Sequence, residues 1–276
     1  MKIASVIPTV VVSALAISFV VVSAARSQPG RPRVIDGKPR TVVMELFTSQ
    51  GCSSCPPADE LISRLGREQV PGARVIPLAF HVDYWNSSGW TDPFSSSLWS
   101  ARQNDYARAL HSDHLYTPQL VVNGTAQMVG SDERRVRQQI ERDLLHGDQG
   151  AVKFVRVAID GSAIRADLRG RVEHSLAGHD TKVIVALYEN NTATAVARGE
   201  NSGRRLANDY IVRSLVSAFP LTTTDADVSG SVTIPVRPEW KRSNLGLAAF
   251  IQDSRSLAIY AAAAQGIEPA AVRRDR

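Results

Sequence analysis

The two cysteines of the chain, Cys52 and Cys55, are two residues apart, and this pair constrains the fold more than any other feature. The apolar run at 41–47 before the pair predicts a buried strand. Prolines directly after Cys55 fit the first turn of a helix, where a missing N–H costs nothing, and Ser54 is the predicted N-cap. Apolar residues then recur at helical spacing: Ala58, Leu61, Ile62 and Leu65. The sequence therefore predicts a strand, a turn with the Cys-x-x-Cys pair, and a helix.

The position of this pair before a helix favours redox chemistry. Free N–H groups and the positive end of the helix dipole stabilise a thiolate there. Cys52, on the turn, is the expected exposed and attacking sulfur, and Cys55 is the expected buried and resolving sulfur. The spacing also allows a Cys52–Cys55 disulfide. A structural disulfide is the alternative, although such a bond usually closes a longer loop, where its entropic effect is larger.

The N-terminal segment predicts export. Residues 1–25 are almost wholly apolar and end in small residues, which is typical of a signal peptide, with an uncleaved membrane anchor as the alternative. Residues 26–40 are rich in Pro, Gly and Arg and read as a tether. We therefore expect a periplasmic or secreted bacterial protein, a setting that permits disulfides. The membrane is an expected partner only if residues 1–25 stay uncleaved.

The charge distribution argues against a nucleic-acid partner. The net charge is +5, and the arginines are scattered along the chain, with a short basic tail at 266–276. A dispersed basic surface is more often a solvated face than a nucleic-acid footprint. No nucleic acid is therefore expected.

The remaining chain divides into two parts at 148. Residues 41–148 predict a strand at 74–80, a helix at 96–110, an Asn-Gly hairpin after Thr117-Pro118, and a helix capped by Ser131. Residues 149–265 predict short strands separated by turns. They fall at 152–159, 164–169, 182–188, 194–198, 210–216, 232–236, 246–251 and 257–262. The predicted fold is an α/β domain followed by a β-rich, sandwich-like domain.

The first part resembles the thioredoxin-like superfamily, in which a strand, a Cys-x-x-Cys helix and a hairpin that begins with Thr-Pro follow one another. More narrowly, the chain is similar to a secreted family catalogued as domain of unknown function 1223. Five segments carry this likeness: 45–59, 81–85, 116–119 and, further on, Gly199-Glu200-Asn201 and Phe250-Ile251-Gln252-Asp253. The resemblance implies an α/β thioredoxin-like domain at 41–148, but it implies no agreed activity.

The resemblance also suggests roles for residues around the cysteines. The Thr117–Pro118 bond matches the cis-proline of the superfamily, beside which an extended partner peptide pairs with the Thr117 backbone. The alternative is a proline that forms a turn and has no binding role. Glu45 lies near the place of a buried acid, and the alternatives are a proton shuttle for Cys55 or an acid satisfied by a neighbouring arginine. Ser53 and Ser54, between the cysteines, leave oxidant and reductant roles open.

An aromatic loop leaves the second strand at the same edge of the sheet as the cysteines. Its residues His81, Asp83, Tyr84 and Trp85 are the expected wall of a substrate cleft. The alternative is a cluster that caps the sheet and packs the loop, with His81 and Asp83 hydrogen-bonded. A metal site is not expected, although Cys52, Cys55 and His81 are a weak alternative set of ligands for Cu(I) or Zn.

These observations predict an exported thiol–disulfide oxidoreductase that acts on protein thiols or disulfides in the cell envelope. Its redox-active disulfide requires no further cofactor. The alternative is a copper-binding module, or a redox-silent module that binds a partner.

Overall fold

The computed structural model describes residues 39–267. The predicted signal peptide, nearly all of the tether and most of the basic tail lie outside the described residues. Within 39–267, no helix is long and apolar enough to cross a membrane.

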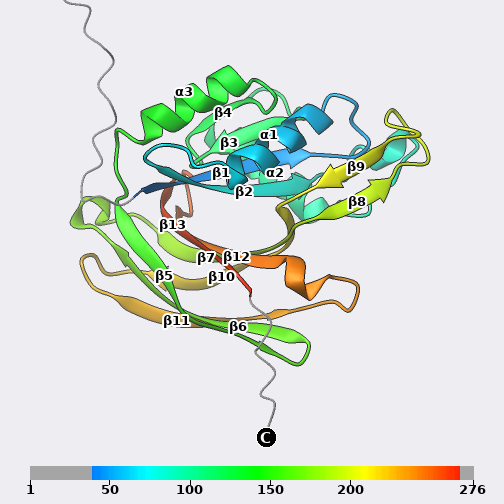
Figure 1. Cartoon of the computed structure of the whole chain (residues 1–276). Coiled ribbons are helices and arrows are strands. Elements are labelled where there is room, and N and C mark those ends of the chain that lie inside the picture. The colour runs from blue at the N-terminus through cyan, green and yellow to red at the C-terminus, as the bar shows by residue number, and fades with distance from the viewer. Residues whose placement is uncertain (1–38, 268–276) are drawn as a thin grey trace, which may run out of the picture. The chain divides into compact units, whose positions relative to one another are not determined.

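The part of the described chain before residue 148 alternates strands and helices (Figure 1). Its elements are β1 (Arg40–Thr48), α1 (Pro56–Arg67), β2 (Ala73–His81), α2 (Ser97–Ala109), β3 (Gln119–Val122), β4 (Ala126–Val129) and α3 (Glu133–Asp143). The predicted strands, helices and hairpin of this part are therefore confirmed. Two predicted caps are wrong: α1 begins after Cys55 rather than Ser54, and α3 begins after Asp132 rather than Ser131.

The later part of the described chain is built from strands and single helical turns. Its strands are β5 (Gly150–Asp160), β6 (Ala163–Val172), β7 (Thr181–Glu189), β8 (Thr192–Ala195), β9 (Arg205–Asn208), β10 (Ile211–Leu221), β11 (Val228–Pro235), β12 (Leu245–Asp253) and β13 (Ile259–Gly266). The sequence pattern did not predict β9.

Strands from both parts form one mixed sheet of eight strands, in the order β13-β12-β7-β10-β2-β1-β3-β4. The predicted fold class, a thioredoxin-like α/β domain followed by a sandwich-like domain, is therefore wrong. The described residues are mostly β, with three α-helices. Whether residue 148 also divides units that fold separately stays a prediction.

The junction in this sheet lies between β2 and β10. Ile211 pairs with Ala79 in parallel, and the Ala79 N–H donates to the Tyr210 carbonyl at 2.8 Å. A second backbone contact joins the two parts: the N–H of Ile259, at the start of β13, donates to the carbonyl of Asn123, just after β3, at 2.9 Å. Apolar periodicity identifies strands but not which distant strands pair, so the shared eight-stranded sheet could not be predicted from it.

Strands β7 and β12 are buried on both faces, which explains their nearly continuous apolar sequences. Val185 and Leu247 face a core made with β5 and β6. Ile184 and Phe250 face a second core with α2 and the β1–β2 pair. These two strands therefore form a wall shared by two cores.

Side chains of β1 alternate between two cores. Met44 and Leu46 pack under α1 and α3, whereas Val43 and Phe47 pack towards α2. The faces of this strand pair are therefore covered by different helices. A buried group on the α2 face of β1 is therefore separated by the strand from α1, which begins at the cysteines.

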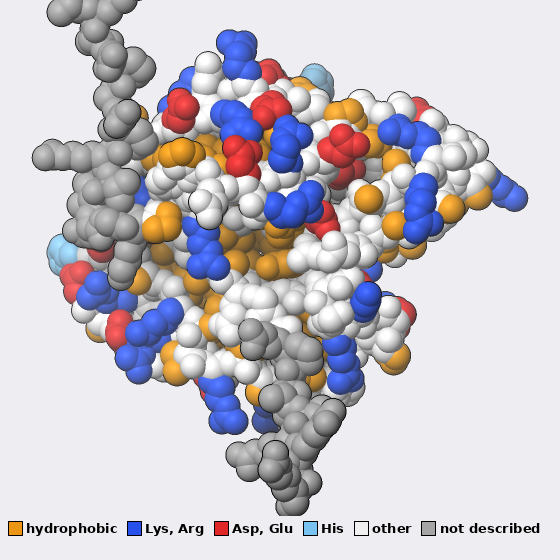
Figure 2. Space-filling model, viewed as in Figure 1, with side chains coloured by type: hydrophobic (Ala, Val, Ile, Leu, Met, Phe, Trp, Pro, Cys, Tyr) orange, Lys and Arg blue, Asp and Glu red, His pale blue; other side chains and the backbone are white. Residues whose placement is uncertain are grey.

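Charged side chains of both signs intermingle over α1 and α3 on the face that Figure 2 shows. Arg64 pairs with Glu133, and Arg137 pairs with Glu68, so two ion pairs join the two helices. Exposed pairs of this kind contribute only about 0–1 kcal/mol each. The packing beneath the helices therefore holds them in place.

Candidate functional site

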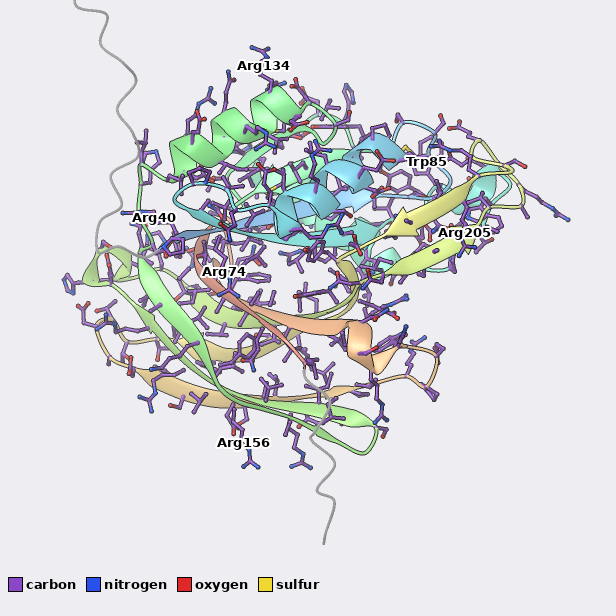
Figure 3. All side chains as sticks on the ribbon, in the orientation of Figure 1. Arg40, Arg74, Trp85, Arg134, Arg156 and Arg205 are labelled. Atoms are coloured by element: carbon purple, nitrogen blue, oxygen red, sulfur yellow. A yellow bond between two sulfur atoms is a disulfide. The ribbon has the colours of Figure 1, made fainter. Side chains whose placement is uncertain are left out.

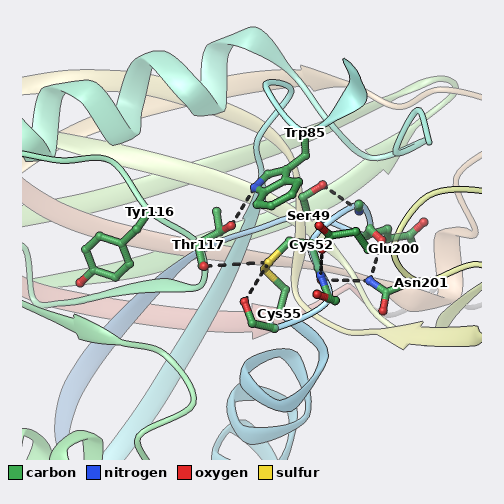
Figure 4. Close-up of a disulfide and its surroundings, with 12 residues drawn as sticks. Ser49, Cys52, Cys55, Trp85, Tyr116, Thr117, Glu200 and Asn201 are labelled. Carbon is green, nitrogen blue, oxygen red and sulfur yellow. Dashed lines mark hydrogen bonds between the residues drawn. A yellow bond between two sulfur atoms is a disulfide. The ribbon is translucent and has the colours of Figure 1, made fainter. Parts of the chain in front are cut away.

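Cys52 and Cys55 form a disulfide at the start of α1 (Figure 4). Cys55 is the N-cap residue, and its carbonyl accepts from the N–H groups of Ala58 and Asp59. β1 leads directly into this turn, so the strand and the helix fix the pair between them. The bond between Thr117 and Pro118 is cis, as the resemblance implied.

The sulfur of Cys52 lies between two oxygen atoms. The Ser54 hydroxyl donates to it at 3.3 Å, because a disulfide sulfur carries no proton of its own. The Thr117 carbonyl oxygen lies 3.9 Å from the same sulfur. The Trp85 indole N–H donates to the Thr117 hydroxyl at 2.8 Å and so fixes the ring beside this carbonyl.

Trp85 lies at the end of the β1–β2 pair nearest β9, which carries Arg205 (Figure 3). Arg40 and Arg74 mark the opposite end of this strand pair. A side chain at Gly51 would meet the Trp85 Cβ at 3.2 Å and its carbonyl oxygen at 3.3 Å. Glycine at 51 therefore permits the turn and the aromatic loop to approach closely.

A loop between β8 and β9 covers the cysteine turn from the other side. The side-chain amide of Asn201 donates to the carbonyls of Gln50 and Cys52, both at 2.9 Å. The exposed Glu200 carboxylate accepts from the Ser53 N–H at 2.9 Å. Bonds from the side chain and backbone of Ser53 lower the pKa of Glu200.

This cover leaves no exposed surface on either Cys52 or Cys55. The expectation that Cys52 is exposed is therefore wrong for the disulfide-bonded protein. The β8–β9 loop, which comes from the later part of the chain, bonds to the backbone of this turn and contributes to its burial. Periodicity around the cysteines carries no information about this contact.

Gln50, two residues before Cys52, joins the turn to two distant segments through three hydrogen bonds. Its N–H donates to Asp92 at 2.7 Å, and its side-chain amide donates to Asn208 at 3.0 Å, 158 residues away in sequence. The Trp90 indole donates to its side-chain oxygen at 3.3 Å. These bonds hold the turn against both the aromatic loop and β9.

His81 lies inside the molecule, not on an open wall. It has no exposed surface, and its Nδ1 lies 2.7 Å from Asp92 Oδ2. Burial acts to lower the pKa of His81, but the charge and hydrogen bond of Asp92 outweigh it and raise that pKa. Burial acts to raise the pKa of Asp92, but His81 and the N–H groups of Gln50 and Phe94 lower it. The two groups therefore favour an imidazolium–carboxylate pair.

A third titratable group, Asp59, lies in the first turn of α1, on the buried side of the helix. Burial raises the pKa of Asp59 to about 7, against the opposing attraction of His81. The nearby Thr48 hydroxyl also lowers the pKa of Asp59, although it forms no hydrogen bond with the carboxyl. Within 39–267, three buried side-chain atoms lack a hydrogen-bond partner: Thr48 Oγ1, Asp59 Oδ1 and His81 Nε2.

Glu45 is fully partnered on the other face of β1. Arg102 donates to both carboxylate oxygens, at 2.6 and 2.8 Å, and the Tyr106 hydroxyl donates at 2.5 Å. Burial acts to lower the pKa of Arg102, but the Glu45 carboxylate outweighs it and raises that pKa. None of the hydrogen bonds found for Glu45 reaches a cysteine. This geometry favours the alternative of an acid satisfied by an arginine.

Tyr84 lies at the margin of the site. Its hydroxyl donates to Gln103 on α2 at 3.1 Å, and its side chain is partly exposed. Burial raises its pKa against hydrogen bonds to Gln103 and Thr117. Of the predicted residues, the structure therefore gathers Cys52, Cys55, Trp85 and Thr117 most closely.

No group of three or more His, Cys, Asp or Glu residues within 39–267 is arranged to hold a metal ion. The copper alternative concerns reduced thiols and stays a prediction.

Sequence reasoning missed four residues of the site: Asp59, Asp92, Asn201 and Glu200. Asp59 carried a usable signal, because it lies four residues after Cys55 and three before Ile62, on the apolar face of the predicted helix. A carboxylate on such a face is unusual. The other three act through contacts between distant segments, which local patterns do not predict.

The chain belongs to the family described as protein of unknown function (DUF1223), whose model matches residues 43–252. None of the curated proteins matches the chain.

Two solved structures are similar over most of the chain. A crystal structure of a protein from Agrobacterium tumefaciens has 27% sequence identity and a TM-score of 0.61, covering 84% of this chain and 99% of that one. HBP35 of Porphyromonas gingivalis has 15% identity and a TM-score of 0.61, covering 86% and 79%. At that lower identity, the second likeness concerns the fold alone.

Proposed function

We propose that this protein exchanges thiols and disulfides with protein partners through Cys52 and Cys55. The observation that carries the proposal is a disulfide across a helix N-terminus, with the Cys52 sulfur against the Thr117 carbonyl. Reduction would leave the Cys52 thiolate beside the Ser54 hydroxyl and the free N–H groups of α1, which stabilise it. The proposed setting is the bacterial periplasm or exterior, where disulfides persist.

The proposed reaction has two exchange steps. The Cys52 thiolate attacks a partner disulfide, so a Cys52–partner bond forms and the partner sulfur–sulfur bond breaks, releasing a partner thiolate. Cys55 then loses its proton and attacks Cys52, which re-forms the internal disulfide and releases the second partner thiol. The partner is reduced by two electrons and Cys52–Cys55 is oxidised; the reverse sequence oxidises a dithiol partner. At the site, this is the chemistry of thioredoxin-like oxidoreductases.

A partner must displace part of the cover to reach Cys52. Trp85 and the Asn201 loop are the groups that would move, and Thr117 is the proposed backbone contact for an extended partner segment. Glycines with positive φ at 199 and 203 flank the covering residues. They allow backbone conformations that other residues adopt at a higher energy.

The deciding experiment measures the reduction potential of the pair in thiol–disulfide buffers, by alkylation and mass. A value between about −120 and −270 mV is expected for a working oxidoreductase. Cys52→Ser should abolish turnover of a model protein disulfide, while Cys55→Ser should trap a mixed disulfide with it. Full activity in Cys52→Ser would overturn the proposal.

A redox-silent partner-binding module is the second candidate, favoured by the complete burial of both cysteines. In that case the disulfide would be a structural bond that holds the turn. A potential below about −300 mV would support this candidate over exchange.

A further inference from the structure

The three unpartnered buried atoms in the described chain meet at one place. Thr48 and His81 are directly opposite each other at the ends of β1 and β2. Their side chains point to the face that α1 covers, since Leu46 and Ala79, two residues earlier, pack there. The Asp59 carboxyl interacts with the charge of His81, and the nearby Thr48 hydroxyl lowers its pKa. Unpaired buried polar groups are costly, so their concentration here requires a reason.

Asp59 is also one helical turn from Cys55, on the buried side of α1. The Asp59 N–H donates to the Cys55 carbonyl at 3.1 Å, and the two side chains have exposed fractions of 6% and 0%. Side chains four residues apart are neighbours on a helix face, with Cβ atoms about 5–6 Å apart. Asp59 is therefore a neighbour of Cys55 on the helix, and its carboxyl is close enough to His81 and Asp92 to interact with their charges.

We propose that Asp59 takes up the proton that Cys55 releases during exchange, and that His81, held by Asp92, is the positioning residue for this transfer. The inference rests on the proposed function and specifies its proton path. After Cys52 has formed a mixed disulfide, the Cys55 S–H proton passes to the Asp59 carboxylate. The Cys55 thiolate then attacks Cys52, the partner thiolate leaves, and Asp59 later returns the proton to solvent or to the partner.

The charges around Asp59 suit this transfer. His81 favours the carboxylate, whereas burial, Asp92 and the exposed Glu60 favour the protonated form. Arg213, on β10, is the other charged group that acts on His81, and it lowers the pKa of His81. The result is a carboxyl whose pKa, about 7, lies near neutral pH, where a general base is most effective.

The test separates the two thiol steps in the full-length reduced chain. The probe is 5,5′-dithiobis(2-nitrobenzoate), which releases one thionitrobenzoate when Cys52 attacks and a second when Cys55 resolves. Asp59→Asn should slow the second release about tenfold or more at pH 7 and leave the first within about twofold. Glu60→Gln, which removes an exposed carboxylate from the same helical turn, is the matched control and should match the unmodified protein in both phases.

The rate of the second release as a function of pH distinguishes proton transfer from a structural role of Asp59, because a structural role would not set the midpoint of that profile. In the unmodified protein, the second release should rise with a midpoint near that of Asp59, about 7. In Asp59→Asn it should follow the thiol itself, with a midpoint near 8.5. His81→Gln removes the cation that favours the carboxylate, so the midpoint should move to higher pH. An Asp59→Asn profile equal to the unmodified one would overturn the proposal.

The outcomes for Asp59 and for the proposed function are distinct. If the unmodified protein shows no first release, the exchange function itself fails. If both releases occur but Asp59→Asn changes neither, only the proton path fails. If Asp59→Asn does not fold, the pKa of the Asp59 carboxyl is measured instead, by carbon-13 NMR titration of the unmodified protein. The midpoint of that titration should equal the midpoint of the second release. A different midpoint would overturn the proposal.

Discussion

Glu45 on β1 and Asp59 on α1 are both buried carboxyl groups, but Glu45 points to the face that α2 covers, and the two have different partners. Glu45 meets Arg102 and Tyr106 in a closed set of hydrogen bonds below α2. Asp59 meets no cation at hydrogen-bond distance, and one of its oxygens is unpartnered. A buried carboxyl that is fully paired stabilises a packing arrangement, whereas one that is under-paired keeps a proton to exchange.

The Glu45 network also joins the two parts of the chain. Gln252 on β12 donates to the Tyr106 hydroxyl at 3.0 Å, and Arg102 donates to the Gln252 side-chain oxygen at 3.3 Å. Residues from β1, α2 and β12 therefore depend on one carboxylate. We expect changes at Glu45 to act on stability, and changes at Asp59 to act on proton binding.

The largest expected effect is on the stability of Glu45→Ala. This variant leaves the Arg102 guanidinium buried and unpaired, which should lower the free energy of unfolding by about 3–5 kcal/mol. Urea denaturation followed by circular dichroism measures it. The double variant Glu45→Leu with Arg102→Met should recover most of the loss, because no buried charge remains. A loss below about 1 kcal/mol in Glu45→Ala would contradict the structural role.

Asp59→Asn should change stability in a way that depends on pH. The pKa of Asp59 is raised in the folded protein to about 7, from 3.8. As pH rises from about 4 to 7, the unfolded chain loses this proton while the folded protein keeps it, so the folded protein becomes less stable; above about 7 the effect is constant. Asparagine removes this loss.

Relative to the unmodified protein, Asp59→Asn should therefore gain about 2–4 kcal/mol between pH 4 and pH 8. Urea denaturation of the oxidised protein at several pH values measures the gain. Glu60→Gln is the control and should show a much flatter profile, because its carboxylate is exposed. A pH-independent difference for Asp59→Asn would show that its carboxyl titrates normally.

The sequence predicts a role for only one of the two acids. The superfamily resemblance implies a buried acid near Glu45, on the strand, and implies no role for Asp59. The Cys-x-x-Cys turn, α1 and the Thr117–Pro118 hairpin could be predicted because each depends on local spacing. Which acid faces the cysteines depends on the pleat of β1 and on which helix covers each face.

Contacts between distant segments explain the other misses. The β8–β9 loop reaches the cysteine turn through Asn201, and Gln50 reaches Asn208. These pairs form only after β10 has joined β2 and carried the later part of the chain to this edge. Each segment looks like a turn or a short strand by itself, so neither the cover nor the eight-stranded sheet follows from periodicity.

Asn201→Ala tests this cover with an effect of intermediate size. It leaves the carbonyls of Gln50 and Cys52 without their buried donor, which should lower the free energy of unfolding by about 1–3 kcal/mol. Dithiothreitol should also reduce the disulfide several times faster, because Cys52 gains access. Ser202→Ala, at the exposed neighbour, is the control. An unchanged reduction rate would show that another group limits access.

Trp85→Phe is expected to have the smallest effect. Phenylalanine keeps an aromatic ring at this position but removes the N–H that donates to Thr117, a loss of about 0.5–1.5 kcal/mol in unfolding free energy. If that bond holds the Thr117 carbonyl against Cys52, the variant should weaken trapping of a partner peptide by Cys55→Ser without slowing the attack of Cys52 on a small disulfide. If Trp85→Phe changed peptide trapping and the attack on the small disulfide equally, Trp85 would act on the Cys52 sulfur rather than on the partner contact. Tyr84→Phe, at the margin of the site, is the control variant.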